Sequence, residues 1–329
     1  MNRKPLTREE VASVIEGRSI ASRVPMMVHF WCNPARFGDR EEAAREILDA
    51  YPMDLQVVGI NMPKVFDAPE DDPEYRWVNY DDPFKDSNVA IDSRMAIDDW
   101  ARLDGILEHF PKPSYPNLLP SPAGPDGRYR LGNFWFCFFE RHWSLRGMTN
   151  ALMDYYLRMM GRAANIGLDG IFTSDDLGTQ TGPFFSPAIF KDFFAPYYRE
   201  LVAKAHSLGM HFWLHCCGNV EEFIPDWIEM GLNVLHPIQK HTMDDATIAR
   251  EFGKDICIWA GLDVQQVIPW GTPEEVRAET RFLIDTYLRP EGRLMLTAGN
   301  GITEDCPVES LRAFCDEAYN YGLKKVATR

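Results

Sequence analysis

Short apolar runs alternate with helical patterns along most of the 329-residue chain. Apolar runs of about four to eight residues between polar or glycine-rich turns are typical of buried strands, and apolar residues at spacings of about three and four predict helices. The pattern predicts eight strands, at 23–31, 54–61, 131–140, 169–176, 210–217, 232–239, 256–263 and 293–299. It predicts helices between most of them, at 40–51, 149–167, 187–208, 220–231, 245–253, 272–288 and 307–322.

Eight strands separated mostly by helices predict an α/β fold, a (β/α)8 TIM barrel, and the chain length fits one such domain. We therefore expect a single domain over residues 1–329, with an insertion and loop region at 62–130 between strands two and three. A doubly wound open sheet is the main rival architecture. It would favour a glycine-rich phosphate turn after an early strand, and no such turn is present in the sequence.

Composition and net charge limit the classes of binding partner to be expected. Hydrophobic residues make up 45% of the chain and charged residues 25%, which is an ordinary globular balance. The net charge of −15 argues against a basic surface that grips nucleic acid or an anionic membrane. A small anionic substrate held by a few arginines stays compatible with that charge.

The sequence also bears on the compartment. No apolar run approaches membrane-spanning length, and the charged start MNRKPLTREEV lacks the apolar region of a secretory signal. The seven cysteines are an odd number without a disulfide framework. We expect a cytoplasmic protein with reduced thiols.

Polar or glycine-rich residues follow several predicted strands, where a barrel carries its active site. The stretch WLHCCGNV gives the clearest signal. Because strand side chains alternate, His215 and Cys217 point the same way, whereas Cys216 points away and packs as a small hydrophobe. His-x-Cys offers two zinc-compatible ligands, half of a tetrahedral site. The alternative is that His215 hydrogen-bonds a substrate or a backbone group and Cys217 fills space.

Asp175 and Asp176 end the fourth predicted strand, and alternation sends one toward the barrel axis and the other toward the helices. The inward carboxylate is a candidate metal ligand, general base or partner of a substrate cation. The structural alternatives are a helix cap and an ion pair with an arginine. Gln239, Asp263 and Asn300 end the next predicted strands and are candidates to hydrogen-bond a substrate, although each could be an ordinary loop residue.

Five stretches together resemble the uroporphyrinogen decarboxylase superfamily over most of the chain. They are TREEVASVIEGRSIASRVPMM, FERHWSLRGMTNALMDY, the block from SDDLGTQ to LHPIQ, AGLDVQQVIPWGTPEEV, and TAGNGITEDCPVESLRAF. The resemblance implies the same barrel that the strand rhythm predicts. It also leaves a homodimer open, because dimers are common in the superfamily.

The superfamily divides by chemistry. Its tetrapyrrole decarboxylases carry an arginine-rich segment after the first strand, which binds substrate carboxylates without metal. The corresponding segment here reads HFWCNPARFGDR, in which Arg36 and Arg40 remain but the motif is missing. This departure argues against porphyrinogen decarboxylation.

The corrinoid-linked methyltransferases of the superfamily bind zinc through His-x-Cys after strand five and a cysteine after strand eight. His215 and Cys217 match the first pair, whereas the third position falls on Asn300. Asp176 or Asp263 could replace the missing thiolate, and we take Asp263 as the expected third ligand beside His215 and Cys217. A metal with fewer thiolates is more electrophilic and suits a methyl ether or methylamine better than a thiol.

These observations lead to one hypothesis and two alternatives. The hypothesis is a zinc-dependent methyltransferase that moves a methyl group from a small methylated donor to a corrinoid carried by a cobalamin-binding partner protein, with zinc as Lewis acid. The expected catalytic residues are Asp175, Asp176, Gln239 and Asn300. One alternative is a metal-free decarboxylase that holds a carboxylated substrate with His215, an aspartate and rim arginines. The other is a barrel that binds a tetrapyrrole or corrinoid without chemistry.

Overall fold

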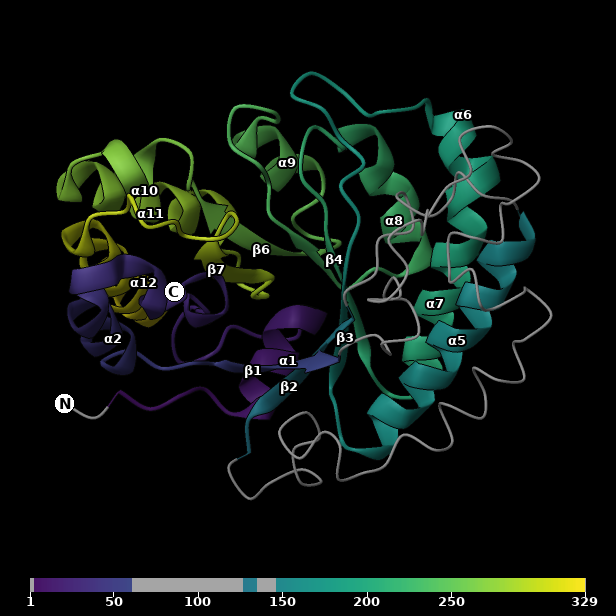
Figure 1. Cartoon of the computed structure of the whole chain (residues 1–329), viewed down its shortest axis with the longest axis horizontal. Coiled ribbons are helices and arrows are strands. Elements are labelled where there is room, and N and C mark those ends of the chain that lie inside the picture. The colour runs from purple at the N-terminus through teal and green to yellow at the C-terminus, as the bar shows by residue number, and fades with distance from the viewer. Residues whose placement is uncertain (1–2, 61–126, 135–145, 329) are drawn as a thin grey trace, which may run out of the picture.

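Among the residues that the structure describes, seven parallel strands form one curled sheet, and their order in the sheet is their order in the chain (Figure 1). The computed structural model describes residues 3–60, 127–134 and 146–328. The strands are β1 (Leu55–Ile60), β2 (Tyr129–Phe134), β3 (Gly170–Ser174), β4 (His211–His215), β5 (Val234–His236), β6 (Cys257–Leu262) and β7 (Leu294–Ala298). Sequential parallel strands need a crossover on the sheet's outer face, and from β2 onward helices supply it.

Helices surround this sheet. They are α1 (Arg8–Glu16), α2 (Glu41–Asp49), α5 (Arg146–Asn165), α6 (Pro187–Ile189), α7 (Ala195–Ser207), α8 (Ile224–Met230), α9 (Asp245–Glu251), α10 (Val267–Trp270), α11 (Pro273–Tyr287) and α12 (Val308–Ala327), with short 3₁₀ helices at His29–Trp31, Pro34–Arg40 and Glu221–Phe223 and a π-helix at Phe190–Phe194. In Figure 1, α5, α7 and α8 lie on one side of the sheet and α2, α11 and α12 on the other. The helices α6, α9 and α10, which follow β3, β5 and β6, lie toward the top.

The two ends of the sheet are joined by residues 25–27. Leu296 of β7 donates its backbone N–H to Pro25 and accepts one from Met27, at 2.8 and 3.0 Å. On the other side, the N–H of Asp54, which precedes β1, reaches the carbonyl of Met26 at 3.4 Å. These bonds place the segment between the last strand and the first.

A buried ion pair holds this joining segment. The Asp54 side chain is 0% exposed and receives two guanidinium hydrogen bonds from Arg23, each of 2.6 Å. The same carboxylate accepts the backbone N–H groups of Leu6 and Met26, both at 2.8 Å. It therefore occupies the Met26 amide on the side of the segment that faces β1, while the other side pairs with Leu296 of β7 through a bridge.

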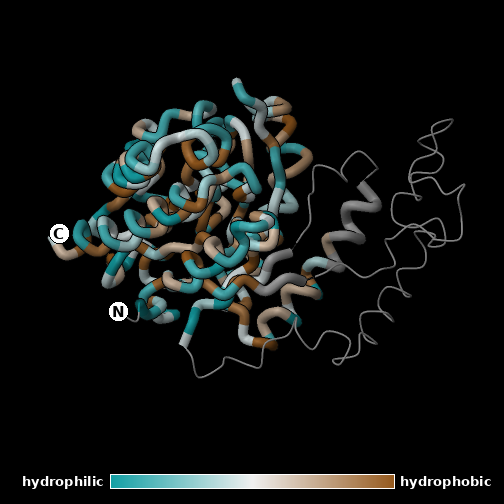
Figure 2. Tube along the Cα trace, turned by 60° about the vertical axis from the view of Figure 1, so that its left-hand side comes forward, coloured by the Kyte–Doolittle hydropathy of each residue, from teal (hydrophilic) through white to brown (hydrophobic). Residues whose placement is uncertain are grey.

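Alternate strand residues belong to two different core clusters. Phe172, Trp213, Val234, Trp259 and Met295 pack together on the inner side of the curled sheet. Their immediate neighbours along the strands pack instead against the surrounding helices. Hydrophobic segments accordingly run through the inside of the body, and hydrophilic ones follow its outer turns (Figure 2). This parity tells which strand-end side chains face the axis.

The expected α/β architecture with a parallel sheet and outer helices is confirmed, and seven of the eight predicted strands are present and start within a few residues of their expected starts. The end of the strand predicted over 131–140 lies outside the described residues. The strand predicted over 23–31 is wrong: residues 25–27 join the sheet as a bridge, and a 3₁₀ helix follows at His29–Trp31. The expected insertion over 62–130 falls almost wholly outside the described residues. Within the described ranges, no helix is both long and apolar enough to cross a membrane.

The joining ion pair gives a testable prediction. Replacing Asp54→Ala leaves the Arg23 guanidinium buried without its partner, so we expect the free energy of unfolding to fall by about 3–5 kcal/mol. Denaturant unfolding measures the change. Arg199→Ala serves as the control, because its ion pair with Glu229 is solvent-exposed and contributes at most about 1 kcal/mol. Equal losses in the two variants would show that the buried pair does not hold the segment.

Candidate metal centre

The ends of β3 and β4 lie side by side, with Ser174 opposite His215 in the parallel register. The loops that leave these strands stay in contact, because the N–H of Gly178 bonds the carbonyl of Cys217 at 3.2 Å. Gly218 has a φ of +84°, and a Cβ placed on it would lie 2.2 Å from the carbonyl carbon of Gly178. Only glycine fits this approach, which brings the loop with Asp176 against the loop with Cys217.

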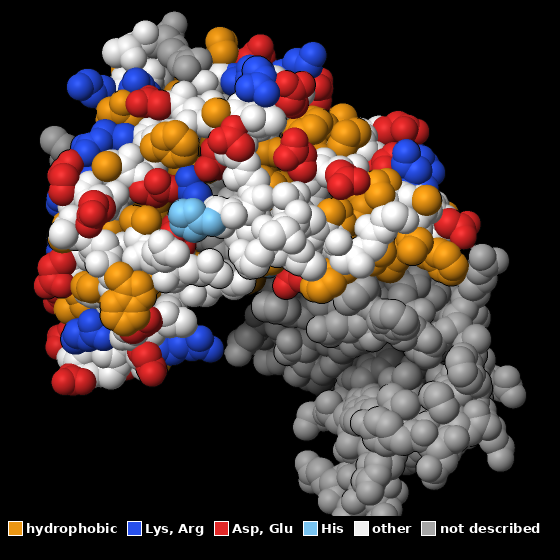
Figure 3. Space-filling model, turned by 90° about the horizontal axis from the view of Figure 1, so that it is seen from above, with side chains coloured by type: hydrophobic (Ala, Val, Ile, Leu, Met, Phe, Trp, Pro, Cys, Tyr) orange, Lys and Arg blue, Asp and Glu red, His pale blue; other side chains and the backbone are white. Residues whose placement is uncertain are grey.

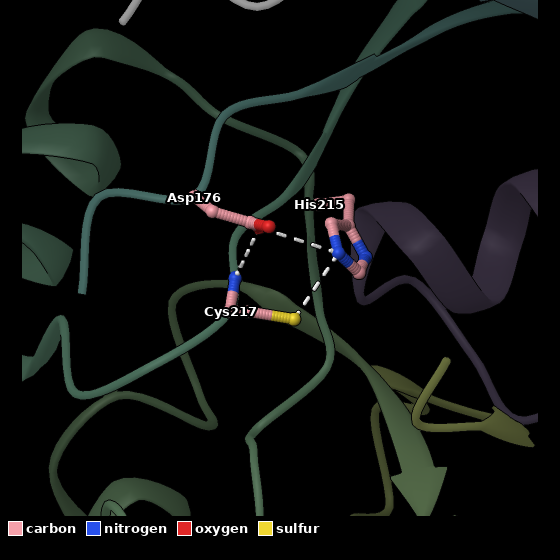
Figure 4. A group of neighbouring side chains, drawn as sticks. All are labelled: Asp176, His215 and Cys217. Atoms are coloured by element: carbon pink, nitrogen blue, oxygen red, sulfur yellow. Dashed lines mark hydrogen bonds and ion pairs between the residues drawn. The ribbon is translucent and has the colours of Figure 1, made fainter. Parts of the chain in front are cut away.

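Three side chains converge where these loops meet (Figure 4). His215 Nε2 lies 3.3 Å from Cys217 Sγ and 3.4 Å from Asp176 Oδ1. The backbone N–H of Cys217 also donates to Asp176 Oδ1, at 2.9 Å. The three potential ligand atoms all lie within 4.8 Å of one another, and this is the group of metal-ligand type found among the described residues.

The geometry fits a zinc ion. Zinc binds nitrogen at about 2.0 Å and sulfur at about 2.3 Å, so tetrahedral angles place nitrogen and sulfur ligands about 3.5 Å apart. The observed separation of 3.3 Å between His215 Nε2 and Cys217 Sγ is close to this value. Nitrogen, sulfur and carboxylate oxygen are also the ligand types that zinc accepts. Since Asp176 has a side chain 57% exposed, a fourth position beside it can be reached from solvent.

A buried hydrogen-bond chain orients the His215 ring. His236 Nε2 lies 3.1 Å from the carbonyl oxygen of Ala298, which can only accept, so this nitrogen carries a proton. Burial lowers the pKa of His236 well below its usual value and keeps the ring neutral, which makes its Nδ1 an acceptor. His215 Nδ1, 2.7 Å away, must then be the donor. In the neutral ring of His215, the Nε2 lone pair therefore points toward Asp176 and Cys217.

Aromatic rings enclose this histidine pair. Trp31 stacks on His236 with ring centroids 5.0 Å apart and an interplanar angle of 9°, and it also lies against His215 at 5.4 Å. Phe172 and Trp259 pack against His236 from the barrel interior. These contacts restrict both rings, as a metal site requires of its histidine ligand and that ligand's partner.

The pKa values of Cys217 and Asp176 shift in opposite directions. Burial, reinforced by the nearby Asp176 carboxylate, raises the pKa of Cys217 to about 12, so the thiol is protonated at neutral pH when no cation is near. Burial alone would raise the pKa of Asp176, but the His215 contact, when Nε2 of that ring carries a proton, and the hydrogen bond from the Cys217 amide outweigh burial and lower that pKa. A bound cation would replace the thiol proton and join a carboxylate that is already charged.

In each pair of neighbouring candidate residues at the ends of β3 and β4, one side chain faces the centre and the other faces the outer core, as strand alternation predicts. Cys217 faces the centre, whereas Cys216 is buried in the outer core and accepts the Leu177 N–H on its sulfur at 3.3 Å. Asp176 faces the centre, whereas Asp175 is fully buried and accepts a hydrogen bond from Tyr198 of α7. Asp175 therefore anchors the strand end to a helix and does not reach the group.

Gln239 and Asn300 both contact the loop or side chain of Cys217. Gln239 Oε1 accepts the Gly218 N–H at 2.6 Å, which makes it a positioning residue for the Cys217 loop. Asn300 Nδ2 lies 3.8 Å from Cys217 Sγ, so the residue at the expected third ligand position reaches the site with its amide. Asp263, expected as a ligand, does not belong to the group of three. Its Oδ1 instead accepts the N–H groups of Gln265 and Gln266, at 2.7 and 3.3 Å.

Sequence reasoning missed three contributors: His236, Trp31 and Gly218. His236 was detectable, because it ends the strand after that of His215 and a parallel register sets the two abreast. Trp31 was hidden by the wrong strand prediction over 23–31. Gly218 carries a signal only after one knows that another loop passes over it.

Comparison with known proteins places the chain in a family. The family model for uroporphyrinogen decarboxylase (URO-D) matches residues 137–321, more than half of the chain, and the chain belongs to this family. Two curated relatives from Methanosarcina mazei also match. Methylcobamide:CoM methyltransferase MtbA is 29% identical over 126 residues, or 38% of this chain and 35% of the relative. Methylated-thiol–coenzyme M methyltransferase is 25% identical over 165 residues, or 50% and 41%.

The matched regions thus cover well under half of either relative's length. Among solved structures, a methyltransferase from Methanosarcina mazei superposes with a TM-score of 0.58 at 14% identity, covering 96% of this chain and 99% of that one. At 14% identity this structural similarity shows a shared fold only. The family resemblance read from the sequence is confirmed, together with its leaning toward methyltransferases, since both curated relatives are methyltransferases.

The raised pKa of Cys217 predicts how metal affinity depends on pH. Below about pH 12 the free thiol is protonated, so zinc must displace at least one proton, and affinity should rise about tenfold per pH unit for each proton displaced. Zinc titration against a competing chelator at pH 6, 7 and 8 measures the slope, as an order-of-magnitude test. An affinity that stays constant across this range would show that the thiol is not a ligand.

The hydrogen-bond chain through His236 gives a second prediction. His236→Phe keeps a flat ring against Trp31 but removes the acceptor for His215 Nδ1, so zinc affinity should fall about 10–100-fold. The same competition titration measures the loss, and circular dichroism checks that the fold persists. His206→Gln is the control, because His206 lies at the far end of α7 and bonds Asn233. An unchanged zinc affinity in His236→Phe would show that the hydrogen bond from His215 to His236 does not contribute to metal binding.

Proposed function

We propose that this protein is a zinc-dependent methyltransferase that moves a methyl group from a small methylated donor to a corrinoid carried by a cobalamin-binding partner protein. The observation that carries the proposal is the convergence of Asp176, His215 and Cys217 within 4.8 Å at the ends of β3 and β4. Membership of the uroporphyrinogen decarboxylase family and the two methyltransferase relatives support the same chemistry.

The ligand set favours a donor that leaves through oxygen or nitrogen. The relatives' names refer to methylcobamide, coenzyme M and methylated thiols. In this chain one thiolate, one imidazole and one carboxylate would hold the ion, and the place of a second thiolate is taken by the Asn300 amide. Zinc with a single thiolate ligand supplies a stronger Lewis acid, which suits the heteroatom of a methyl ether or methylamine.

Each residue at the site would have a separate role in binding the ion. His215, with its ring held by His236, and Cys217 would keep the ion at the barrel mouth, and the exposed Asp176 would complete the set on the substrate side. The CH₃–X bond of the donor breaks with its electron pair left on X. The methyl group bonds to cobalt(I) of the corrinoid, which is thereby oxidised to cobalt(III).

The role expected of Asp263 changes in this proposal. Its Oδ1 is engaged by two backbone amides after β6, while Asp176 supplies the carboxylate beside His215 and Cys217. We therefore assign the third ligand to Asp176. Gln239 acts through the Gly218 amide, and Asp175 supports the strand end through Tyr198.

Neighbouring cysteines allow a matched test. Cys217→Ser should reduce the zinc content of the purified chain from about one ion to a small fraction, and methyl transfer should fall with it by at least about 10–100-fold. Cys216→Ala should retain both, because that sulfur lies in the outer core. Zinc is measured by elemental analysis, and transfer by methylcobalamin formation from cob(I)alamin with a panel of methyl ethers and methylamines.

The same preparation separates the proposal from its main alternative. Full activity in the presence of a strong chelator, with carbon dioxide released from a carboxylated substrate, would identify a metal-free decarboxylase instead. Stoichiometric zinc in wild type that persists in Cys217→Ser would overturn the assignment of this ligand.

A further inference from the structure

A second pair of polar side chains lies at the mouth, after β5 and β6. Asp263 follows β6, whose residues Cys257 and Trp259 face the barrel interior, so alternation turns Asp263 inward as well. Its side chain is 3% exposed, and its Oδ2 is buried without a hydrogen-bond partner among the described residues. A buried carboxylate oxygen without a partner is costly and needs an explanation.

His241 lies within ion-pair distance of this carboxylate oxygen. Its Nε2 lies 3.6 Å from Asp263 Oδ2, at ion-pair distance, while its side chain is 61% exposed. The other basic side chain in the same turn, Lys240, points away to Asp245 and Glu279 at 2.7 and 2.6 Å. Asp263 is therefore placed to bind and orient the imidazole, while the rest of the ring remains open to solvent.

The backbone at His241 is strained. The N–H of Thr242 bonds the carbonyl of Gln239 at 3.4 Å, which makes His241 the third residue of a four-residue turn. Its φ is +64°, a left-handed value that glycine or asparagine adopts more easily at this position. Non-glycine residues held in such conformations concentrate at functional sites. The strain is thus a second feature, independent of the Asp263 contact, that singles out this histidine.

Hydrogen bonds tie this turn to the metal-site loop. Gln239 Oε1 accepts the Gly218 N–H at 2.6 Å, and the carbonyl of Thr242 accepts from Asn219 Nδ2 at 2.8 Å. The sheet order gives the same placement. Asn300, after β7, contacts Cys217, after β4, so side chains that follow β5 and β6 lie on the arc of the rim between them. Figure 3 views the molecule from above, the side on which the helices following β3, β5 and β6 lie.

We propose that His241, held by Asp263, is the proton donor to the heteroatom that loses the methyl group. The inference rests on the proposed methyl transfer and adds the residue that completes it. When the CH₃–O bond of a methyl ether breaks, its electron pair stays on oxygen, and the imidazolium proton of His241 passes to that oxygen. A neutral alcohol leaves, the methyl group bonds to cobalt(I), and the neutral imidazole regains a proton from water.

Two variants probe the pair without endangering the fold. His241→Gly removes the ring and places at φ +64° the residue that adopts this value most easily. Asp263→Asn keeps an oxygen for the amides of Gln265 and Gln266 but removes the negative charge that faces His241. His206→Gln, a change at the far end of α7, is the control.

The first measurement is methyl transfer from 2-methoxyphenol to cob(I)alamin by the zinc-loaded full chain. His241→Gly should keep its zinc but lose about 10²–10⁴-fold in rate, which is the range for a positioned acid or base, and free imidazole should restore part of the loss. His206→Gln should transfer at the wild-type rate. Undiminished transfer by His241→Gly, or a loss that imidazole cannot restore, would overturn the assignment of the proton donor.

The second measurement needs no turnover. In protein labelled with ¹⁵N-histidine, the His241 ring signals are those missing from His241→Gly, and Asp263→Asn should shift them relative to wild type. Unshifted signals would overturn the pairing. If zinc-loaded wild type transfers no methyl group from any donor, the proposed function fails and the proton-donor role with it, while the ring signals still decide whether the two side chains interact.

Discussion

The close approach of two glycines, Gly178 and Gly218, is the constraint on which the site depends. Each lies where a Cβ would collide with the backbone of the opposite loop, at 2.7 Å or less. Only because both loops lack side chains at this crossing can the carboxylate that follows β3 reach the imidazole and thiol that end β4. The site is thus made by backbone packing first, and its ligand atoms follow from strand alternation.

Around this crossing, the fold prepares the imidazole through successive strands. The register aligns Ser174, His215 and His236 across β3, β4 and β5, and the hydrogen-bond chain ends on the Ala298 carbonyl of β7. Each member fixes the proton position of the next, so the lone pair of His215 is directed by the Ala298 carbonyl, two hydrogen bonds away. Trp31, in the 3₁₀ helix that follows the joining segment, covers the two rings. Ligand orientation is therefore a property of the whole barrel mouth.

Strand alternation explains why much of this could be predicted. It assigned Cys217 to the inner face and Cys216 to the outer one, and it set Asp175 and Asp176 on opposite faces without deciding which of them faces the axis, because these residues lie on or directly after regular strands. Asp263 also turns inward as alternation requires, but it does not belong to the group of three possible metal ligands, although we expected it there from the sequence. The loop crossing at Gly218 decides which inward carboxylate approaches His215. The position of His241 is set by a turn. Neither loop nor turn leaves a periodic pattern in the sequence. The strand predicted over 23–31 was wrong because the Asp54 carboxylate takes the Met26 N–H and the backbone turns into a 3₁₀ helix at His29–Trp31, which leaves only a bridge at Met26.

The joining segment also sets the order in which the molecule can be completed. Residues 25–27 precede β1 in the chain, yet their partners on one side belong to Leu296 of β7. The ring of Trp31 therefore cannot be fixed over the histidine pair by these bonds until β7 has been synthesised. Because such long-range pairings form late, a nascent chain truncated before β7 would hold the cysteine and histidine loop without its aromatic cover. Closure of the barrel mouth therefore has to wait for the synthesis of β7.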